Sequence, residues 1–420
     1  METNKNKKSV FMLRIINLAW KNIWRNKVRS GVILGAIIIG LFSGTFLIAL
    51  MDGWMIGTVK RDIETQFSHV QIHDTTFLAN YDINAYFIRE DIETKIKQSG
   101  LHLKTAFRLN LIGMLASPHN AVGVTTKAVI ADEEMQVTDV WKYIADTMGT
   151  YLTNDNQNAI VISRKIADKL KVKLRSKIVF TFQNAHGDMQ SIAFRVSGIY
   201  KTSNGMFDEA NVFVKQSDVF RYTGLPLGTV HEAAIMFSDL ETCDIIAPQL
   251  KSMFPEMDVQ TWDELNPILK LTLSYTDFMG LIILAIFLLA LSLGIINTML
   301  MAVLERTQEL GMLGSIGMSK RKIFSMIMLE TIFLTLLGGI IGIILGAITI
   351  LPTLENGLDL TPLIQDNFED WGYSSIIYPA LNIQMLMEIV VLVIVAAVLS
   401  AIYPARKALK LKPLDAIKKI

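Results

Sequence analysis

Four long apolar runs, separated by polar segments, dominate the pattern of hydrophobic and polar residues along the chain. The longest uncharged run extends from Phe278 to Leu304. At about 1.5 Å per residue, a helix of this length reaches roughly 40 Å, which exceeds the roughly 30 Å hydrocarbon thickness of a bilayer. The pattern therefore predicts four transmembrane helices, at residues 31–52, 274–304, 323–352 and 383–403.

Between the first two apolar runs, residues 53–273 have the mixed pattern of a water-soluble domain. Apolar and polar residues alternate in several short stretches, as they do in strands with one buried face. The predicted strands are His69–His73, Leu109–Leu115, Ala121–Ile130, Lys177–Phe182, Ile192–Tyr200, Asn211–Val214 and Ala233–Phe237. The predicted helices are Ile88–Gln98, Ser163–Lys171, Leu240–Met253 and Thr261–Leu273. The fold class is therefore a membrane α-helical protein with four transmembrane helices and a large α+β domain between helices 1 and 2. We expect two lobes, with a middle lobe at about residues 135–200.

Two histidines in the first predicted strand have a spacing that a metal site on a helix would use. His69 and His73 lie four residues apart, with Gln71 between them. On a strand, alternate residues share one face, so these three side chains are expected on the solvent face, opposite Val70 and Ile72. A solvated strand face is the preferred interpretation, and no metal site is predicted.

The polar segments around the apolar runs differ in charge, and this difference predicts the topology. The N-terminal residues 1–30, the short segment 305–322 and the tail 404–420 are basic or contain basic clusters, whereas the loop 353–382 has five acidic residues and no Lys or Arg. The positive-inside rule then places both termini and residues 305–322 in the cytoplasm. The α+β domain and the acidic loop are expected on the outer side. Residues 1–30 also combine Phe11, Ile15, Leu18 and Ala19 at helical spacing with Trp20 and Trp24, as expected for an amphipathic helix at the membrane surface.

Composition and motifs indicate a protein without catalytic chemistry of its own. The dipeptide Gly-Lys is absent, so the chain has no phosphate-binding loop, and no H-E-x-x-H or G-x-S-x-G motif occurs. The single cysteine, Cys243, excludes an internal disulfide. The net charge of +1 gives no sign of nucleic-acid binding. The runs also lack the Pro-interrupted helices and repeats typical of secondary transporters. We expect no enzyme activity, no metal and no bound cofactor in this chain.

Glycines within the apolar runs predict close helix packing. Small residues four apart let helix backbones approach in lipid. The glycines of the first run expected at a helix or dimer contact are Gly31, Gly35, Gly40 and Gly44. Gly338, Gly342 and Gly346 form a second ladder of this kind. Near it, Glu330 lies just inside the third run, where we expect it to pair with Lys322 or a neighbour rather than to relay protons.

Three segments carry a resemblance to a known family. They are Leu18–Lys27, Glu305–Ser319 and the pair Tyr403–Ala408 and Lys412–Ile417. Over nearly its full length the chain resembles the permease subunits of ABC transporters in the MacB/FtsX-like superfamily. That superfamily includes macrolide exporters, the cell-division permease and the lipoprotein-releasing permeases. The chain is most similar to the lipoprotein-releasing, LolC/LolE-like branch. The resemblance implies a cytoplasmic ATPase dimer that binds ATP and Mg, and a second permease as partner in a homo- or heterodimer.

The same resemblance identifies residues 305–322 as a coupling helix that docks in a groove of the ATPase. It implies polar contacts from Glu305, Arg306 and Glu309, and tight turns at Gly311 and Gly317. The residues expected to contact the ATPase are Glu305, Arg306, Glu309, Leu310, Gly311, Met312, Leu313, Ile316, Gly317 and Met318.

The branch implies extraction of lipoproteins from a bacterial inner membrane. Candidate acyl-chain contacts in a cavity between the first two transmembrane helices are Phe42, Phe46, Phe278, Ile282 and Phe287. Two departures weaken the match: Arg175-Ser176 replaces a Gly-Asp turn, and Gln183–Gln190 is a short turn in place of a long hairpin that captures a carrier. Two alternatives stay open. One is mechanical control of a periplasmic partner such as a cell-wall hydrolase, and the other is efflux of peptides or drugs through an outer-membrane channel.

Overall fold

The computed structural model describes residues 16–153, 156–364 and 376–409. The chain divides into two compact units. One, here called the helical unit, comprises Met1–Met55, Ser274–Leu358 and Ile377–Ile420. The other, here called the α+β unit, comprises Ile56–Leu273 and Asp359–Ile376. Phe11, Ile15, Lys412–Ile417 and the acidic residues Asp366, Glu369 and Asp370 lie outside the described residues.

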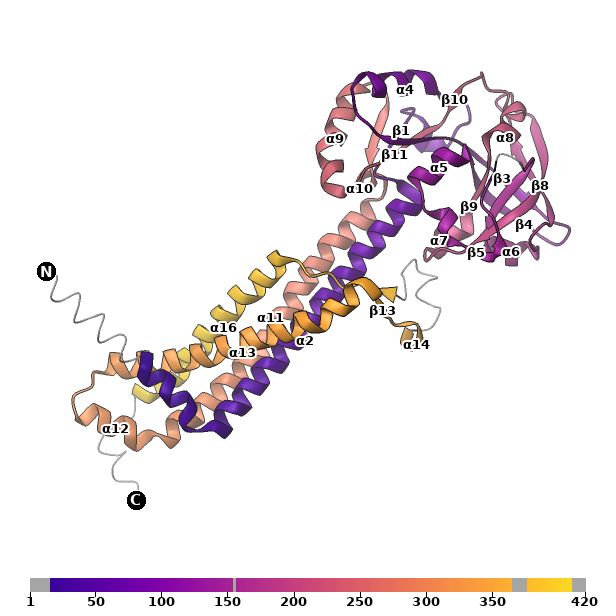
Figure 1. Ribbon diagram of the computed structural model, residues 1–420. Coiled ribbons are helices and arrows are strands. Elements are labelled where there is room, and N and C mark those ends of the chain that lie inside the picture. The colour runs from indigo at the N-terminus through magenta and orange to yellow at the C-terminus, as the bar shows by residue number, and fades with distance from the viewer. Residues whose placement is uncertain (1–15, 154–155, 365–375, 410–420) are drawn as a thin grey trace. The chain divides into compact units, whose positions relative to one another are not determined.

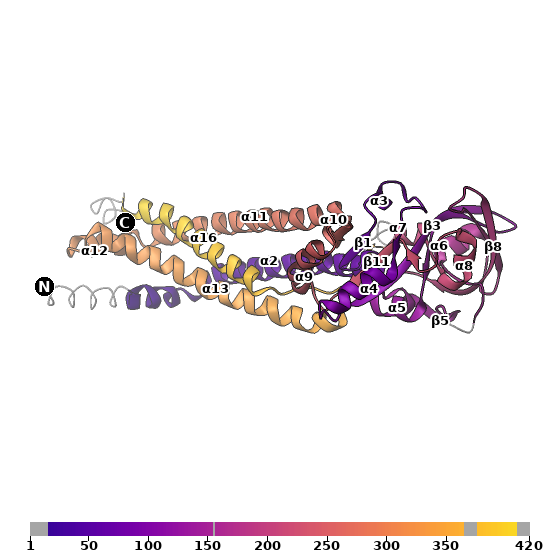
Figure 2. The ribbon, with the colours of Figure 1, turned by 90° about the horizontal axis from the view of Figure 1, so that it is seen from above.

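Four long helices, each apolar enough to cross a membrane, dominate the helical unit (Figure 1). They are α2 (Lys27–Asp62), α11 (Pro267–Glu305), α13 (Lys320–Asn356) and α16 (Ile383–Leu409). Residues 16–25 form a further helix before α2, and the short α12 (Thr307–Ser315) links α11 to α13. Figure 2 shows α12 again at the end of the bundle where α11 ends and α13 begins. The predicted fold class, four apolar helices with an α+β domain between the first and second, is confirmed.

The glycine ladder of α13 brings that helix close to α2. A Cβ atom on Gly338 would lie 2.7 Å from the Cγ2 atom of Ile37, and one on Gly342 would lie 2.9 Å from the carbonyl oxygen of Ile38. Both distances are shorter than an ordinary contact, so a side chain at either position would push the helices apart. A shared core of apolar side chains from α2, α11, α13 and α16 fills the rest of the bundle.

A closed barrel of six strands is the centre of the α+β unit. Its strands pair in the cyclic order β3–β4–β9–β6–β8–β7, and β7 returns to β3. They are β3 (Lys104–Ala116), β4 (Ala121–Val129), β6 (Ala159–Ser163), β7 (Lys177–Gln183), β8 (Met189–Tyr200) and β9 (Asn211–Lys215). Alternate residues point inward, for example Ile178, Phe180 and Phe182 of β7, all buried in one cluster. This alternation is the signal that made β3, β4, β7, β8 and β9 predictable.

Beyond the barrel, the first half of β3 continues into an open sheet in the order β3–β11–β1–β12. The added strands are β1 (Val70–His73), β11 (Glu232–Met236) and β12 (Asp258–Thr261). Helices α4 (Arg89–Gln98) and α9 (Leu240–Met253) bury their apolar faces in a second cluster with this sheet. The smaller elements of the unit are η1 (Ile63–Phe67), α3 (Phe77–Asn80), β2 (Phe87–Ile88), α5 (Ala131–Val137), η2 (Val140–Tyr143), β5 (Ile144–Gly149), α6 (Arg164–Leu170), α7 (Gly205–Ala210), α8 (Gln216–Thr223), β10 (Thr229–Val230) and α10 (Trp262–Leu265).

Three sequence-based expectations for the α+β unit differ from the structure. The barrel takes strands from 104–129 as well as 159–215, so residues 135–200 do not form a sheet of their own. The helix expected over Thr261–Leu273 is broken at Asn266, and its second part belongs to α11. The solvent face predicted for His69, Gln71 and His73 is wrong, since all three side chains are buried. Strand β1 lies between β11 and β12. Side chains of its polar stretch meet distant parts of the chain, since His73 bonds to the carbonyl of His231 and His69 accepts from the backbone N–H of Phe237.

Candidate functional site

The predicted coupling segment folds as a short helix between two sharp breaks. Helix α11 ends at Glu305, and Arg306 leaves the helical conformation at φ −94° and ψ 19° before α12 begins. After α12, Gly317 adopts φ +99°, a conformation that favours glycine, and Ser319 precedes α13. Gly317 therefore makes the turn that was predicted for it. The turn predicted at Gly311 is wrong, because Gly311 is buried inside α12, where neighbouring leucines hold the helix against the bundle.

A buried ion pair fixes the start of α12 to α13. The Nη1 atom of Arg306 lies 2.8 Å from Oε1 of Glu330, and the two side chains are only 14% and 9% exposed. The second guanidinium nitrogen, Nη2, donates to the backbone carbonyl of Asn22 at 3.1 Å. Glu330 therefore pairs with Arg306. A buried pair of this kind is strongly destabilised when one partner is removed, because the other charge is left without compensation.

A second, more exposed ion pair links α12 to the N-terminal helix. Arg25 Nη2 donates to both carboxylate oxygens of Glu309, at 2.6 Å and 2.5 Å. The two side chains are 51% and 45% exposed, so water screens this pair and its contribution is small, roughly 0–1 kcal/mol. Ala19 and Ile23 of the same helix are buried, whereas Trp20 and Trp24 are exposed. Together the two ion pairs connect three separate segments of the chain at one end of the bundle.

The two faces of α12 differ in character. Leu310 and Gly311 are buried, and Leu313 packs against the apolar core of the bundle. On the opposite face, Met312 is 52% exposed, and Ile316, just beyond the helix, is 84% exposed. Gln308 and Ser315 are exposed on the same side. We refer to Gln308, Met312, Ser315 and Ile316 as the α12 outer face.

Of the ten predicted ATPase contacts, several therefore point into the chain itself. Arg306 and Leu310 are mostly buried, Glu309 is engaged with Arg25, and Met318 packs against the core. Glu305, Met312, Ile316 and Gly317 are exposed. Sequence reasoning missed Asn22 and Arg25, which complete this site from the N-terminal helix. The signal was present in the basic, apolar-striped pattern before the first run, but nothing in it specified which acidic residue Arg25 would meet.

A cavity of 330 Å³ lies beneath α12, between that helix, the N-terminal helix, α11 and α13. Its wall is mostly apolar, with Leu18, Met299 and Met326 among the lining residues, and the two ion pairs border it. The site is therefore a helix held at two polar points, with a largely apolar cavity beside its inner face.

The other predicted site residues do not gather in one place. Among the described residues, no atom of a neighbouring segment lies within 4 Å of a Cβ placed on Gly31, Gly35 or Gly44, and one on Gly40 would meet Leu291 of α11. The helix contact made inside this chain uses the α13 ladder instead. Phe42 and Phe46 stack on each other, while Phe278 and Ile282 are exposed on α11. Phe287 lines an apolar cavity of 350 Å³ between α2 and α11, which Gly40 also borders.

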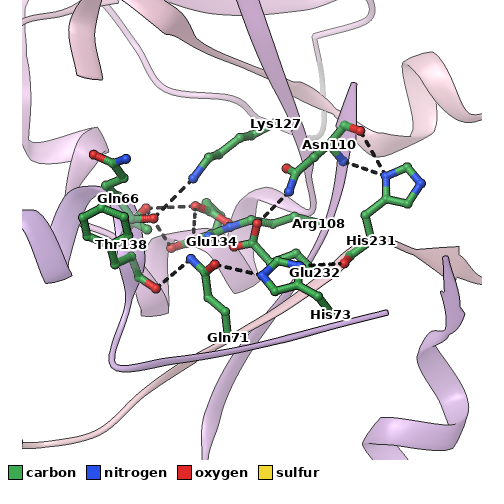
Figure 3. A network of polar contacts seen from close by, with 11 residues as sticks. Gln66, Gln71, His73, Arg108, Asn110, Lys127, Glu134, Thr138, His231 and Glu232 are labelled. Atoms are coloured by element: carbon green, nitrogen blue, oxygen red, sulfur yellow. Dashed lines mark hydrogen bonds and ion pairs between the residues drawn. The ribbon is translucent and has the colours of Figure 1, made fainter. Parts of the chain in front are cut away.

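The α+β unit contains a second polar centre, buried where the barrel meets the open sheet (Figure 3). Arg108 of β3 is fully buried and donates to both carboxylate oxygens of Glu134 at 2.9 Å. It also pairs with Glu232 of β11. Burial raises the pKa of Glu232, but Arg108 and Lys127 outweigh this effect and lower that pKa to about 2. Among the described residues, no group of three or more His, Cys, Asp and Glu side chains is arranged to hold a metal ion.

Two buried histidines extend this centre. Nδ1 of His73 donates to the carbonyl of His231 at 3.0 Å, and Nε2 lies 2.9 Å from the Gln71 side-chain oxygen. Nε2 of His231 donates to the carbonyl of Ile83 at 2.9 Å. Burial lowers the pKa of both His73 and His231 below the ordinary histidine value, although neighbouring carbonyl groups oppose this shift. These side chains make structural hydrogen bonds between strands far apart in the sequence.

The sequence of this chain is similar to those of a known protein family and of several known proteins. Residues 281–413, which contain α12, match the family described as FtsX-like permease C-terminal. An ABC transporter permease described as uncharacterized, MJ1507 of Methanocaldococcus jannaschii, is 23% identical over 98% of this chain and 99% of its own length. The macrolide export ATP-binding/permease protein MacB of Escherichia coli is 23% identical over 80% of this chain, which spans about half of that relative.

Among solved structures, the extracellular domain of the transporter YknZ from Gram-positive bacteria matches 46% of this chain and 99% of its own, at 15% identity and a TM-score of 0.32. The sequence matches agree with the four apolar helices and the intervening α+β unit. Residues 281–413 thus match an FtsX-like permease C-terminal domain, and over nearly its full length the chain is similar to a protein described as an ABC transporter permease.

Proposed function

We propose that this chain is the membrane subunit of an ABC transporter in a bacterial inner membrane, with both termini in the cytoplasm. In this proposal a separate ATPase dimer, which binds ATP and Mg, docks on the α12 outer face. The permease itself binds no cofactor and hydrolyses no nucleotide. Work done by the ATPase enters through α12 and acts on the outer side of the membrane.

The single observation that carries this proposal is the asymmetry of α12. Its inner face is fixed by the Arg306–Glu330 and Arg25–Glu309 pairs, while Ile316 extends into solvent at 84% exposure. An exposed apolar anchor surrounded by polar residues is typical of the centre of a protein–protein contact. A push on this face is transmitted directly to α13 and to the N-terminal helix, because the ion pairs connect α12 to both.

For the cargo, we propose lipoproteins that are extracted toward the outer membrane by a dimer of permeases. The apolar side chains of α11, including Phe278, Ile282 and Leu289, are exposed in the single chain and are available to a second permease, lipid or an acyl chain. The β7–β8 connection, residues 184–188, is too short to act as a hook for a soluble carrier. Cargo transfer to such a carrier would therefore need another subunit.

Export of a small amphiphile through an outer-membrane channel is a second candidate function. The observation that favours it is the similarity to MacB, whose name specifies macrolide export. Mechanical control of a periplasmic enzyme, such as a cell-wall hydrolase, is compatible with the same α12 geometry. Crosslinking from the α+β unit in cells distinguishes these three functions. Captured lipoproteins would support lipoprotein extraction, a captured channel subunit would support export, and a captured hydrolase would support control of a periplasmic enzyme.

The docking itself is tested by Ile316→Glu, which places a charge in the centre of the proposed contact. We expect the variant to lose co-purification with the ATPase and the stimulation of ATP hydrolysis, by about tenfold or more. Leu227→Glu is the matched control, because Leu227 is 89% exposed in the α+β unit. If both variants kept wild-type stimulation, the α12 outer face would not be the docking surface.

A further inference from the structure

The α+β unit contains a polar cavity of 490 Å³ that has no part in the docking of an ATPase. It lies between the end of η1, strand β1 and helix α3, and its walls include His73, Asn110, Lys127 and Glu232. The volume is within the range of roughly 300–1,000 Å³ that small-molecule sites occupy.

Lys127 supplies a positive charge to this cavity. The residue is only 7% exposed, and its ammonium group donates to the carbonyl of Gln66 at the long distance of 3.3 Å. Among the described residues, no carboxylate lies within ion-pair distance of this ammonium. The ammonium also lies 6.0 Å from the centre of the Phe207 ring. A lysine ammonium has three N–H donors, and the Gln66 carbonyl accepts from one of them. Burial without a paired carboxylate lowers the pKa of Lys127 to about 8, and the charge of Arg108 adds to this effect.

Asn110 supplies an acceptor. Its Nδ2 atom donates to Glu232 at 2.6 Å (Figure 3), which fixes the orientation of the amide. Its Oδ1 atom is buried and has no hydrogen-bond partner, and the residue as a whole is 6% exposed. An unsatisfied buried carbonyl oxygen destabilises the folded state, so a native structure normally pairs such an atom with a donor. The cavity therefore offers one cation and one acceptor, both nine-tenths buried.

The charge of Glu232 narrows the choice of ligand. This carboxylate also lines the cavity and is ionised at neutral pH, since Arg108 and Asn110 hold it. A dianion such as phosphate would be repelled by it, whereas a single carboxylate would fit beside Lys127. A donor group on the same ligand would satisfy Asn110 and interact favourably with Glu232.

We propose that this cavity binds a carboxylate with a neighbouring N–H group, which is the chemistry shared by a free amino acid, a short peptide and a peptide C-terminus. The carboxylate accepts from Lys127 Nζ, and the N–H donates to Asn110 Oδ1. The aromatic rings of Phe77 and Tyr81, which also line the cavity, contact the apolar part of the ligand. This site goes beyond the proposed transport role and does not depend on it.

The test is ligand-observed NMR with the full chain in lipid nanodiscs. The probe is N-acetylalanine, with N-acetylalaninamide and inorganic phosphate as matched probes that lack the single carboxylate. We expect saturable binding of N-acetylalanine only. Binding of free alanine and of a ten-residue peptide with the same C-terminus then distinguishes a small metabolite from a protein terminus. Absence of binding by every carboxylate probe, or equal binding of the amide, would overturn the proposal and leave water as the occupant.

Two variants localise the binding. Lys127→Met should weaken it by roughly tenfold or more, since it removes a charge-assisted hydrogen bond. Lys177→Met, at an exposed lysine of β7 outside the cavity, should leave it unchanged. Ala210→Trp is a second variant, which fills the cavity from an exposed position and keeps the polar network intact. It keeps the test valid if Lys127→Met fails to fold. Unchanged binding in both Lys127→Met and Ala210→Trp would place the ligand elsewhere.

Discussion

Arginine is held by carboxylates in each of the two units, but the surroundings differ. In the α+β unit, Arg108 and Glu134 have no exposed surface, and Glu232 completes a triad between the barrel and the open sheet. In the helical unit, Arg306 has one carboxylate partner, Glu330, and borders a cavity.

The difference indicates two mechanical roles. A fully enclosed triad, in which both carboxylates face the same guanidinium, resists rearrangement, because any movement would leave a bare charge in a medium of low polarity. The pair at α12 has a single carboxylate and borders a partly open cavity, so fewer contacts oppose its displacement. We expect the triad to resist rearrangement more strongly than the pair at α12.

The largest effect is expected from Arg108→Met, which removes the cation paired with the buried carboxylates of Glu134 and Glu232. We expect a loss of about 3–5 kcal/mol in the free energy of unfolding of the α+β unit. Hydrogen–deuterium exchange of β3 and β11 peptides in denaturant measures it. Arg195→Met, at an exposed arginine of β8, is the control and should change stability by less than about 0.5 kcal/mol. Equal protection in both variants would contradict a rigid role for the triad.

A smaller effect is expected from Arg306→Met, because Arg306 and Glu330 keep some access to water. Loss of about 1–3 kcal/mol in stability should accompany weaker stimulation of the ATPase. Lys320→Met, at an exposed basic residue of the same region, is the matched control. If Arg306→Met stimulated ATP hydrolysis as strongly as the wild type, the Arg306–Glu330 pair would not transmit movement between the ATPase and α13.

The histidines beside the triad predict a pH dependence in the α+β unit. Because burial lowers the pKa of His73 and His231 in the folded state, the unfolded chain takes up their protons first. The contribution of the two neutral histidines to the free energy of unfolding is complete above about pH 6.5. It is lost as the pH falls toward the folded-state pKa, by up to about 1.4 kcal/mol per pH unit for each histidine. Glu232, with a pKa near 2, keeps its contribution throughout this range. Denaturant unfolding at pH 7.5 and 5.5 tests this, and His73→Gln should flatten the slope whereas the exposed His119→Gln should not.

The smallest effect is expected from the exposed Arg25–Glu309 pair. Arg25→Glu should cost less than about 1 kcal/mol and should matter less as salt increases. The double variant Arg25→Glu with Glu309→Arg restores opposite charges and should recover ATPase stimulation. If the double variant behaved no better than Arg25→Glu alone, the pair would not position α12.

The pattern of hydrophobic and polar residues was sufficient to predict those helices and strands whose buried residues recur at regular intervals along the chain. The four apolar helices and strands such as β7, with Ile178, Phe180 and Phe182 on one face, were predictable because neighbours in sequence share the same environment. The breaks around α12 were visible in part, since Gly317 lies where the chain must turn. Gly311 was not predictable in the same way, because tertiary packing of Leu310 keeps the helix intact there.

The local sequence pattern could not predict the polar contacts between residues far apart in the chain. On β1, the alternating pattern predicted that Gln71 and His73 face solvent. In the structure, His73 forms a hydrogen bond with His231, which is 158 residues away. Arg108 meets Glu232 across 124 residues, and Arg25 meets Glu309 across 284. A sequence shows that such groups are polar, but only the fold shows whether water or a distant partner satisfies them.

The most direct test of the central claim is a photocrosslinking amino acid placed at Ile316 of the α12 outer face in living cells. We predict a specific adduct with an ABC ATPase, and none when the same amino acid replaces Leu227. An adduct at Ile316 with proteins of the outer compartment, or none with an ATPase, would contradict the docking of an ATPase on α12.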